Sequence, residues 1–188
     1  MSPVSRDEAW KLLQEHTQSQ SLILHMLAVE AAMRAYARKL REDEELWGAT
    51  GLLHDFDYER WPNPNRDETG HPFPGVKILR EKGWPEEMCQ AILGHAEYAG
   101  VPRTTPLAKT LFAVDELCGF LTAAAYVRPT KLEGLTPSSV RKKLKAKAFA
   151  AAVSREDIRK GIEELGVPED EHIAFVIEAM QKAIGHRL

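Results

Sequence analysis

Apolar residues recur every three or four positions along most of this chain, and this spacing favours helices throughout. Residues 21–41 are the clearest case, because their apolar side chains fall on one face of a helix with 3.6 residues per turn. These side chains are Leu22, Met26, Val29, Met33, Tyr36 and Leu40. No segment shows the sustained alternation of apolar and polar residues that marks a half-buried strand. The pattern predicts an all-α protein.

Capping and helix-breaking residues give the expected boundaries. Ser5 and Glu8 have the spacing of a capping box, and Thr105-Pro106 is a typical helix start. Helices are expected at residues 5–17, 21–41, 43–55, 73–82, 85–95 and 106–128, and further helices open at residues 154 and 169. Residues 59–72 are polar and rich in proline and asparagine, so we expect a loop there, and long loops in compact domains are often functional.

The composition narrows the class of protein. With 188 residues, 44% hydrophobic and 28% charged, the chain is long enough to bury one core. Its net charge of −3 gives no indication of a nucleic-acid partner or an anionic membrane surface. Residues 1–8 lack the apolar core of a signal peptide, and the longest uncharged apolar stretch, residues 117–127, is too short to span a bilayer. Cys89 and Cys118 suggest no disulfide framework. We therefore expect a cytoplasmic protein with no membrane partner.

Histidines and aspartates are concentrated in or beside the apolar helical stretches between residues 25 and 115. They are His25, His54, Asp55, His71, His95 and Asp115. Imidazole and carboxylate groups together suit divalent metals such as iron, manganese, zinc or nickel. Asp115 lies within a strongly apolar run, where a carboxylate needs a partner and a cation is the simplest one. Taken singly, His25 also fits a core position, His71 an exposed turn, and His95 a helix C-terminus.

The order of these residues, His25…His54-Asp55…Asp115, resembles the HD superfamily of metal-dependent phosphohydrolases over residues 20–128. With His71 and His95 in between, it is similar to the six-ligand variant that binds two metals. The resemblance implies a helical bundle in which His25, His54, Asp55 and Asp115 hold one metal. It also implies that Asp55 bridges to a second metal held by His71 and His95, and that His54 and Asp55 are catalytic.

The resemblance leaves the metal open: one or two divalent ions are expected, with iron, manganese, magnesium, zinc and nickel as candidates. The chain departs from the pattern of some HD enzymes, which follow the His-Asp pair with Ile-Gly and then a lysine. Here the pair is followed by Phe56-Asp57-Tyr58, so no lysine is available at that position to contact a phosphate. Asp57 or Glu59 either orients a ligand histidine or is a solvated acid at the helix end.

Several other residues are candidates for binding the substrate. Helix periodicity places Gly119 and Thr122 on the same face as Asp115, where they leave space beside the metals or allow close helix packing. Glu97 follows His95 and is expected at the mouth of the site, with the loop 59–70 as a lid. Arg128 and Lys131 are candidate phosphate ligands. The basic run 141–147 is a solvated helix face or attracts a phosphorylated molecule. His16, His172 and His186 match no motif and are expected at the surface.

These observations predict an HD-type metal-binding helical domain at residues 1–130 and a small C-terminal helical extension at residues 131–188, packed on the same domain. The extension is a candidate cap over the pocket or a homodimer contact. The expected function is hydrolysis of a small phosphorylated metabolite or nucleotide by metal-activated water. The first alternative is a mixed-valence di-iron oxygenase with the same six ligands. The second is a non-enzymatic, metal-stabilised module that senses a nucleotide.

Overall fold

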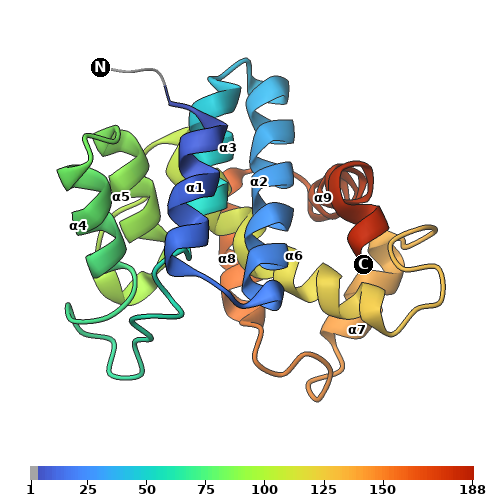
Figure 1. Ribbon diagram of the computed structural model, residues 1–188. Coiled ribbons are helices and arrows are strands. Elements are labelled where there is room, and N and C mark those ends of the chain that lie inside the picture. The colour runs from blue at the N-terminus through green and yellow to red at the C-terminus, as the bar shows by residue number, and fades with distance from the viewer. Residues whose placement is uncertain (1–3) are drawn as a thin grey trace.

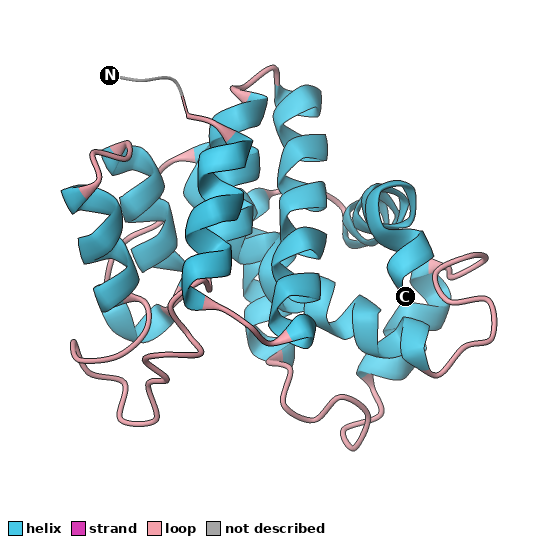
Figure 2. Cartoon of the chain, in the orientation of Figure 1, coloured by secondary structure: helices cyan, strands magenta, loops and turns pink. Residues whose placement is uncertain are grey.

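The computed structural model describes residues 4–188, and within them it contains helices and turns but no strand (Figure 2). The all-α prediction is therefore confirmed. Residues 1–3, part of the segment expected to lack a signal peptide, lie outside the described residues. The helices are α1 (Arg6–His16), α2 (Gln20–Leu40), α3 (Glu44–Leu53), α4 (Phe73–Glu81), α5 (Glu86–His95), α6 (Pro106–Tyr126), α7 (Pro137–Leu144), α8 (Arg155–Leu165) and α9 (Glu169–Ile184), with short 3-10 helices at Glu97–Ala99 and Gly185–Arg187.

Side-chain caps explain why several helices begin where they do. Asp43 accepts hydrogen bonds from the first backbone N–H groups of α3, and Thr105 and Ser154 do the same for α6 and α8. These bonds satisfy donors that have no partner inside the helix. Ser5 precedes α1, but its side chain makes no capping hydrogen bond. The capping box predicted for residues 5–8 was therefore wrong, although the helix begins there.

The helices surround α2 and α6, the two longest. Helix α2 packs against α3, α6 and α9, while α6 also contacts α5 and α8. In Figure 1, α4 and α5 lie on one side of this central group, and α7 and α9 lie on the other. The extension after residue 130 thus packs directly on α2 and α6 through α8 and α9. The division into a metal-binding domain at residues 1–130 and an extension at residues 131–188 stays a prediction.

Two glycines allow close contacts between helices that position the site. A Cβ on Gly51 of α3 would lie 3.0 Å from the backbone of Glu30 in α2, so a side chain there would push these helices slightly apart. A Cβ on Gly161 of α8 would lie 2.7 Å from the Cα of Ala113 in α6. The first contact brings the end of α3 beside α2, and the second brings α8 directly against α6.

His172 is buried, so the prediction of a surface position was wrong. It lies on α9 and is 1% exposed. Its Nδ1 accepts a hydrogen bond of 2.6 Å from the Tyr36 hydroxyl, and its Nε2 donates to the carbonyl of Ala113 at 2.9 Å. The residue therefore links α9 to α2 and α6. His172 lies four residues before the buried Val176, so helix periodicity places both residues on one face and could have predicted its burial. His16 is half-buried, and His186 is exposed as expected.

Candidate metal centre

The six histidines and aspartates of the motif come from five separate segments and lie together. His25 is on α2, His54 and Asp55 follow α3, His71 precedes α4, and His95 ends α5. The sixth, Asp115, lies in the middle of α6. Five of them line one cavity of about 610 Å³, and His54 lies beneath it, fully buried. The turn that carries Asp55 is fixed in place because Phe56 is in the core and its carbonyl accepts a 2.8 Å hydrogen bond from Thr17.

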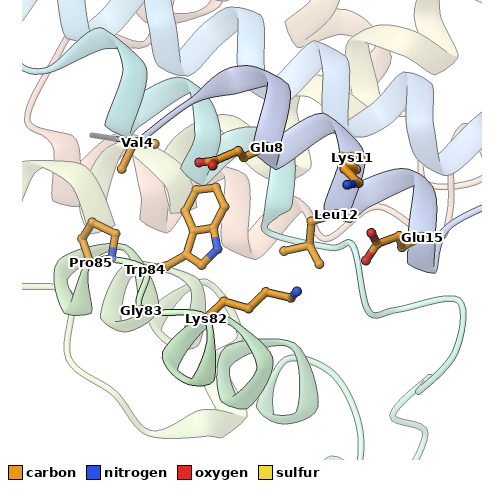
Figure 3. Close-up of a pocket in the computed structure, with 9 residues that line it drawn as sticks. All are labelled: Val4, Glu8, Lys11, Leu12, Glu15, Lys82, Gly83, Trp84 and Pro85. Carbon is orange, nitrogen blue, oxygen red and sulfur yellow. The ribbon is translucent and has the colours of Figure 1, made fainter. Parts of the chain in front are cut away.

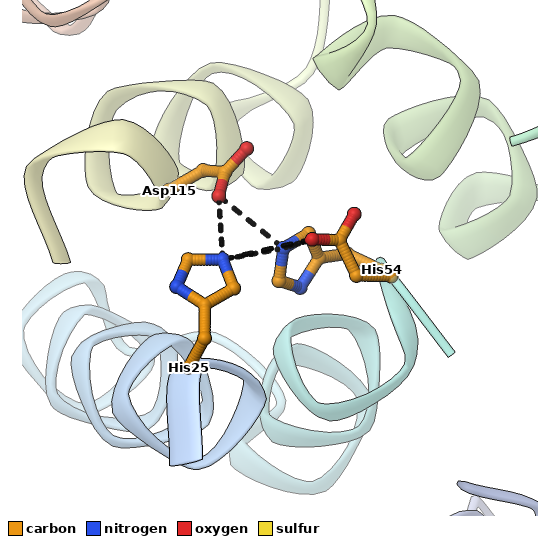
Figure 4. A group of neighbouring side chains, drawn as sticks. His25, His54 and Asp115 are labelled. Atoms are coloured by element: carbon orange, nitrogen blue, oxygen red, sulfur yellow. Dashed lines mark hydrogen bonds and ion pairs between the residues drawn. The ribbon is translucent and has the colours of Figure 1, made fainter. Parts of the chain in front are cut away.

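The first cluster consists of His25, His54, Asp55 and Asp115. The Nε2 atoms of His25 and His54 are 3.3 Å apart, and each lies close to Asp115 Oδ1, at 3.0 Å and 3.3 Å. Asp55 Oδ2 is 3.7 Å from His25 Nε2 and 3.3 Å from His54 Nε2. Figure 4 shows the two rings and the Asp115 carboxylate pointing toward a common centre from different helices.

The second cluster is formed by His71, His95 and the other oxygen of Asp55. Asp55 Oδ1 lies 3.2 Å from His71 Nε2 and 3.4 Å from His95 Nε2, and the two nitrogens are 3.2 Å apart. The Asp55 carboxylate therefore faces the first cluster with one oxygen and the second cluster with the other. This is the arrangement that a bridging carboxylate requires.

Hydrogen bonds on the far side of three rings determine which nitrogen faces the cluster. His54 Nδ1 lies 2.8 Å from the Gly51 carbonyl, His95 Nδ1 lies 2.5 Å from the Ile92 carbonyl, and His71 Nδ1 lies 2.6 Å from Asp57 Oδ1. Because these oxygens only accept, each Nδ1 carries the proton and donates. In the neutral tautomer, each Nε2 then presents a lone pair to carboxylate oxygens and other lone pairs. Such convergence of acceptors needs a positive charge at its centre.

Asp57 holds His71 in position. It is 1% exposed, and its second oxygen, Oδ2, accepts a 2.8 Å hydrogen bond from the backbone N–H of Gly75. A Cβ on Gly75 would lie 2.6 Å from Asp57 Cγ, so glycine is required for this contact. Of the two acids expected to orient a histidine, Asp57 makes the contact. Glu59 instead accepts from the backbone N–H groups of Gln18 and Ser19, at the surface.

Charge in the cluster shifts the pKa of its members in a consistent direction. Burial alone lowers the pKa of His54, but Asp55 and Asp115 outweigh it and raise that pKa well above the usual value. For Asp55 and Asp115, burial opposes ionisation, and the imidazoles, His54 foremost, hold both pKa values below the usual range. Burial, reinforced by Asp115, raises the pKa of Glu116 to about 7. The cluster thus favours ionised Asp55 and Asp115 with positive charge between them.

Two of the five candidate substrate-binding residues line the cavity, namely Glu97 and Gly119. The other three are not part of its lining. The Thr122 hydroxyl donates to the Cys118 carbonyl, as a helix residue commonly does. The Arg128 guanidinium donates to the carbonyls of Lys131 and Glu133, so it stabilises its own turn. The expectation that Arg128 and Lys131 contact a phosphate has no support in this geometry.

The outer wall of the cavity comes from α8 and its cap, in the extension that the sequence suggested as a candidate cap over the pocket without assigning any residue. The residues concerned are Ser154, Glu156, Asp157 and Lys160. They lie far beyond Asp115 in the sequence, and the packing of α8 on α6, including the close contact at Gly161, brings them near. Glu116, which also lines the cavity, was recognisable as the neighbour of Asp115. Its carboxylate accepts a 2.9 Å hydrogen bond from the backbone N–H of Ser154 and so joins α6 to the start of α8.

A second cavity, of about 520 Å³, lies between α1 and the turn that joins α4 to α5 (Figure 3). Trp84 and Leu12 are among its apolar residues, and Glu8 and Glu15 are its carboxylates. Its lining contains no histidine and no aspartate. It therefore lacks the ligand cluster, and the candidate centre lies in the cavity that the motif residues line.

Of the comparisons with known proteins, the one with family models agrees with the geometry. No curated protein and no solved structure matches the chain significantly. Within residues 4–188, no helix has the length and apolar character needed to cross a membrane. A family model described as HD domain matches residues 22–119, a segment that includes all six clustered side chains. That match covers more than half of the 188 residues, so the chain belongs to the HD domain family, whose members are generally metal-dependent phosphohydrolases.

Proposed function

We propose that this HD domain protein is a metal-dependent phosphohydrolase that acts on a small phosphorylated molecule. One observation carries the proposal: acceptor atoms of six side chains converge on two adjacent points, and Asp55 gives one oxygen to each. Added protons or metal cations are the two means of supplying the positive charge that such a cluster needs. Family membership favours metal ions.

The spacing of the donor atoms fits metal ions. Two ligand atoms that each lie about 2.1 Å from one ion, at angles of about 90–110°, are separated by about 3.0–3.4 Å. Between the nitrogen and oxygen atoms described above, the separations run from 3.0 Å to 3.7 Å, and most of them fall within the expected range. His25, His54, Asp55 and Asp115 would hold one ion, and Asp55, His71 and His95 the other. Divalent ions bound there would supply Lewis-acid activation of water and neutralise charge on a phosphoryl group.

The protein's own part is to hold the donors and to shape the cavity. Asp57 fixes the His71 ring, and the carbonyls of Gly51 and Ile92 fix those of His54 and His95. The lining provides no activated nucleophile. Ser154 is occupied as the cap of α8, where its hydroxyl accepts from the Asp157 N–H at 3.1 Å. Burial raises the pKa of the nearby Cys118 thiol well above its usual value, which keeps it protonated. Water is then the expected nucleophile.

The test is release of phosphate by protein that has been stripped with a chelator and reloaded with manganese, iron, magnesium, zinc or nickel. A panel of phosphomonoesters serves as substrate. We expect metal-dependent release that falls by roughly 100-fold or more in Asp55→Asn, since residues that act as a unit in catalysis cost orders of magnitude when one is removed. Asp7→Asn, at an exposed position on α1, is the matched control and should retain activity.

The alternatives have distinct outcomes in the same experiment. Oxygen consumption by the iron-loaded protein, without phosphate release from any ester, would refute hydrolysis and support the di-iron oxygenase. Retention of metal with neither activity would support the metal-stabilised binding module. Equal phosphate release by wild type and Asp55→Asn would show that the activity does not arise at this site.

A further inference from the structure

The cavity that holds the clustered residues is strongly acidic for a site that accepts a phosphate. Besides Asp55 and Asp115, its lining includes the carboxylates of Glu97, Glu116, Glu156 and Asp157. The arginine and lysine side chains of this lining are Arg66 and Lys160. An anionic substrate therefore depends on few positive charges beyond those of bound metals, and the state of each basic side chain matters.

Lys160 is already paired. Its ammonium group lies 2.6 Å from Glu97 Oε2, and the same Glu97 carboxylate also accepts from Arg103. This ion pair joins α8 to the 3-10 helix after His95 across the mouth of the cavity. Arg66 differs, because no carboxylate lies within 4.0 Å of its guanidinium among residues 4–188. It is exposed, and its charge is available to a ligand.

The loop that carries Arg66 is attached to the candidate centre. The backbone N–H of Arg66 donates to the Asn63 carbonyl at 3.3 Å, which closes a tight turn. The Asn63 side chain in turn donates to the carbonyls of Asp67 and His71, at 2.7 Å and 2.8 Å. A Cβ on Gly70 would lie 2.7 Å from Asn63, so glycine permits this packing. The position of Arg66 is thus linked through Asn63 to the backbone of His71.

From these observations we infer that Arg66 binds the phosphate of the substrate at the metal centre, an inference that rests on the proposed function. A guanidinium presents paired N–H donors that match two phosphate oxygens. Arg66 then supplies the basic contact that Lys160, paired with Glu97, does not. The position of Arg66 also identifies the side of the cavity where the phosphate lies. The acidic wall formed by Glu156 and Asp157 then faces the rest of the substrate.

The experiment measures binding of inorganic phosphate to the manganese-loaded protein by isothermal titration calorimetry. Wild type is compared with Arg66→Met, Arg66→Lys and, as matched control, Arg60→Met. Arg60 is on the same loop and carries the same charge, but its guanidinium donates to the Glu15 carbonyl and it is not part of the cavity lining. Metal content and melting temperature are measured for each variant, so that loss of metal or of fold is detected separately.

We expect Arg66→Met to weaken phosphate binding by roughly tenfold or more, as the loss of a charge-assisted hydrogen bond does. Arg66→Lys should retain part of the affinity, because it keeps the charge but loses the paired donors. Arg60→Met should bind as wild type does. With an active ester, KM should rise in Arg66→Met much more than kcat falls.

Unchanged phosphate affinity in Arg66→Met, with metal content intact, would overturn the inference and leave the proposed hydrolase standing. Equal losses in Arg60→Met and Arg66→Met would also overturn it, because they would reflect general charge. Absence of phosphate binding in the metal-loaded wild type would refute the Arg66 site outright. Conversely, Arg66-dependent phosphate binding in a protein that hydrolyses no ester would support the anion site and refute the hydrolase.

Discussion

Acidification should destabilise this protein through His172, a buried residue outside the cluster of six motif residues. Its ring is buried between α2, α6 and α9, and burial lowers its pKa from 6.5 to about 4. The Ala113 carbonyl favours the charged ring but does not outweigh burial, the Tyr36 hydroxyl donates to Nδ1, and the Lys39 ammonium adds repulsion. Protonation would also abolish the acceptor that Tyr36 uses. The folded state therefore favours the neutral ring.

The sign and size of the effect follow from linkage. Because the folded pKa is below the unfolded one, the unfolded chain takes up a proton first as the pH falls. Stability is complete above about pH 6.5 and is lost progressively toward pH 4. Below pH 4 both states are protonated and no further loss arises from this residue. The difference between pKa 6.5 and about 4 corresponds to about 3 kcal/mol in total, and about 2 kcal/mol of it is lost between pH 7 and pH 4.5.

The assay is urea unfolding at pH 7 and pH 4.5, with chelator present so that metal release does not contribute. Wild type is compared with His172→Asn, which keeps an acceptor near Tyr36 but does not titrate, and with His186→Asn, an exposed control. The free energy of unfolding should fall by about 2 kcal/mol more in wild type and in His186→Asn than in His172→Asn. Parallel losses in all three proteins would refute the reasoning.

Three other predictions concern the site and its supports. Gly161→Ala should destabilise the fold by about 1–3 kcal/mol despite the higher helix propensity of alanine, because the added Cβ would lie 2.7 Å from Ala113 Cα; an unchanged urea midpoint would contradict this contact. Asp57→Asn should weaken binding of one metal by roughly 10- to 100-fold in a calorimetric titration, and wild-type affinity would exclude its orienting role. The double variant Glu156→Gln/Asp157→Asn should raise kcat/KM for diphosphates and triphosphates relative to monophosphates, since less negative charge faces the added phosphates; a constant ratio would show that the acidic wall does not select.

Local signals in the sequence predicted two features of this protein, the helices and the clustering of the motif residues. Apolar periodicity and capping residues predicted the helices, and the ordered histidines and aspartates predicted which side chains lie together. The structure brings those six together. Their role as metal ligands stays a prediction, as do the catalytic roles assigned to His54 and Asp55.

Local sequence signals could not predict the features that depend on contacts between segments distant in the sequence. The outer wall from α8 requires the close approach of Gly161 to Ala113, and nothing near the motif signals it. Arg128 was assigned to the site because it follows α6, but the chain turns after that helix and its guanidinium bonds to its own loop. Arg66 was placed in a lid, and only the Asn63 contacts show how that loop is fixed. The burial of His172, by contrast, could have been predicted from the apolar face of α9.

The central claim is that the two clusters share Asp55 as a bridging ligand to two metal ions. Elemental analysis of protein purified without added metal or chelator, and again after reconstitution, tests it most directly. We expect about two divalent ions per chain in wild type and in Asp7→Asn, and one or none in Asp55→Ala. Absence of metal in the wild type under every reconstitution condition, or equal metal content in Asp55→Ala, would contradict the account.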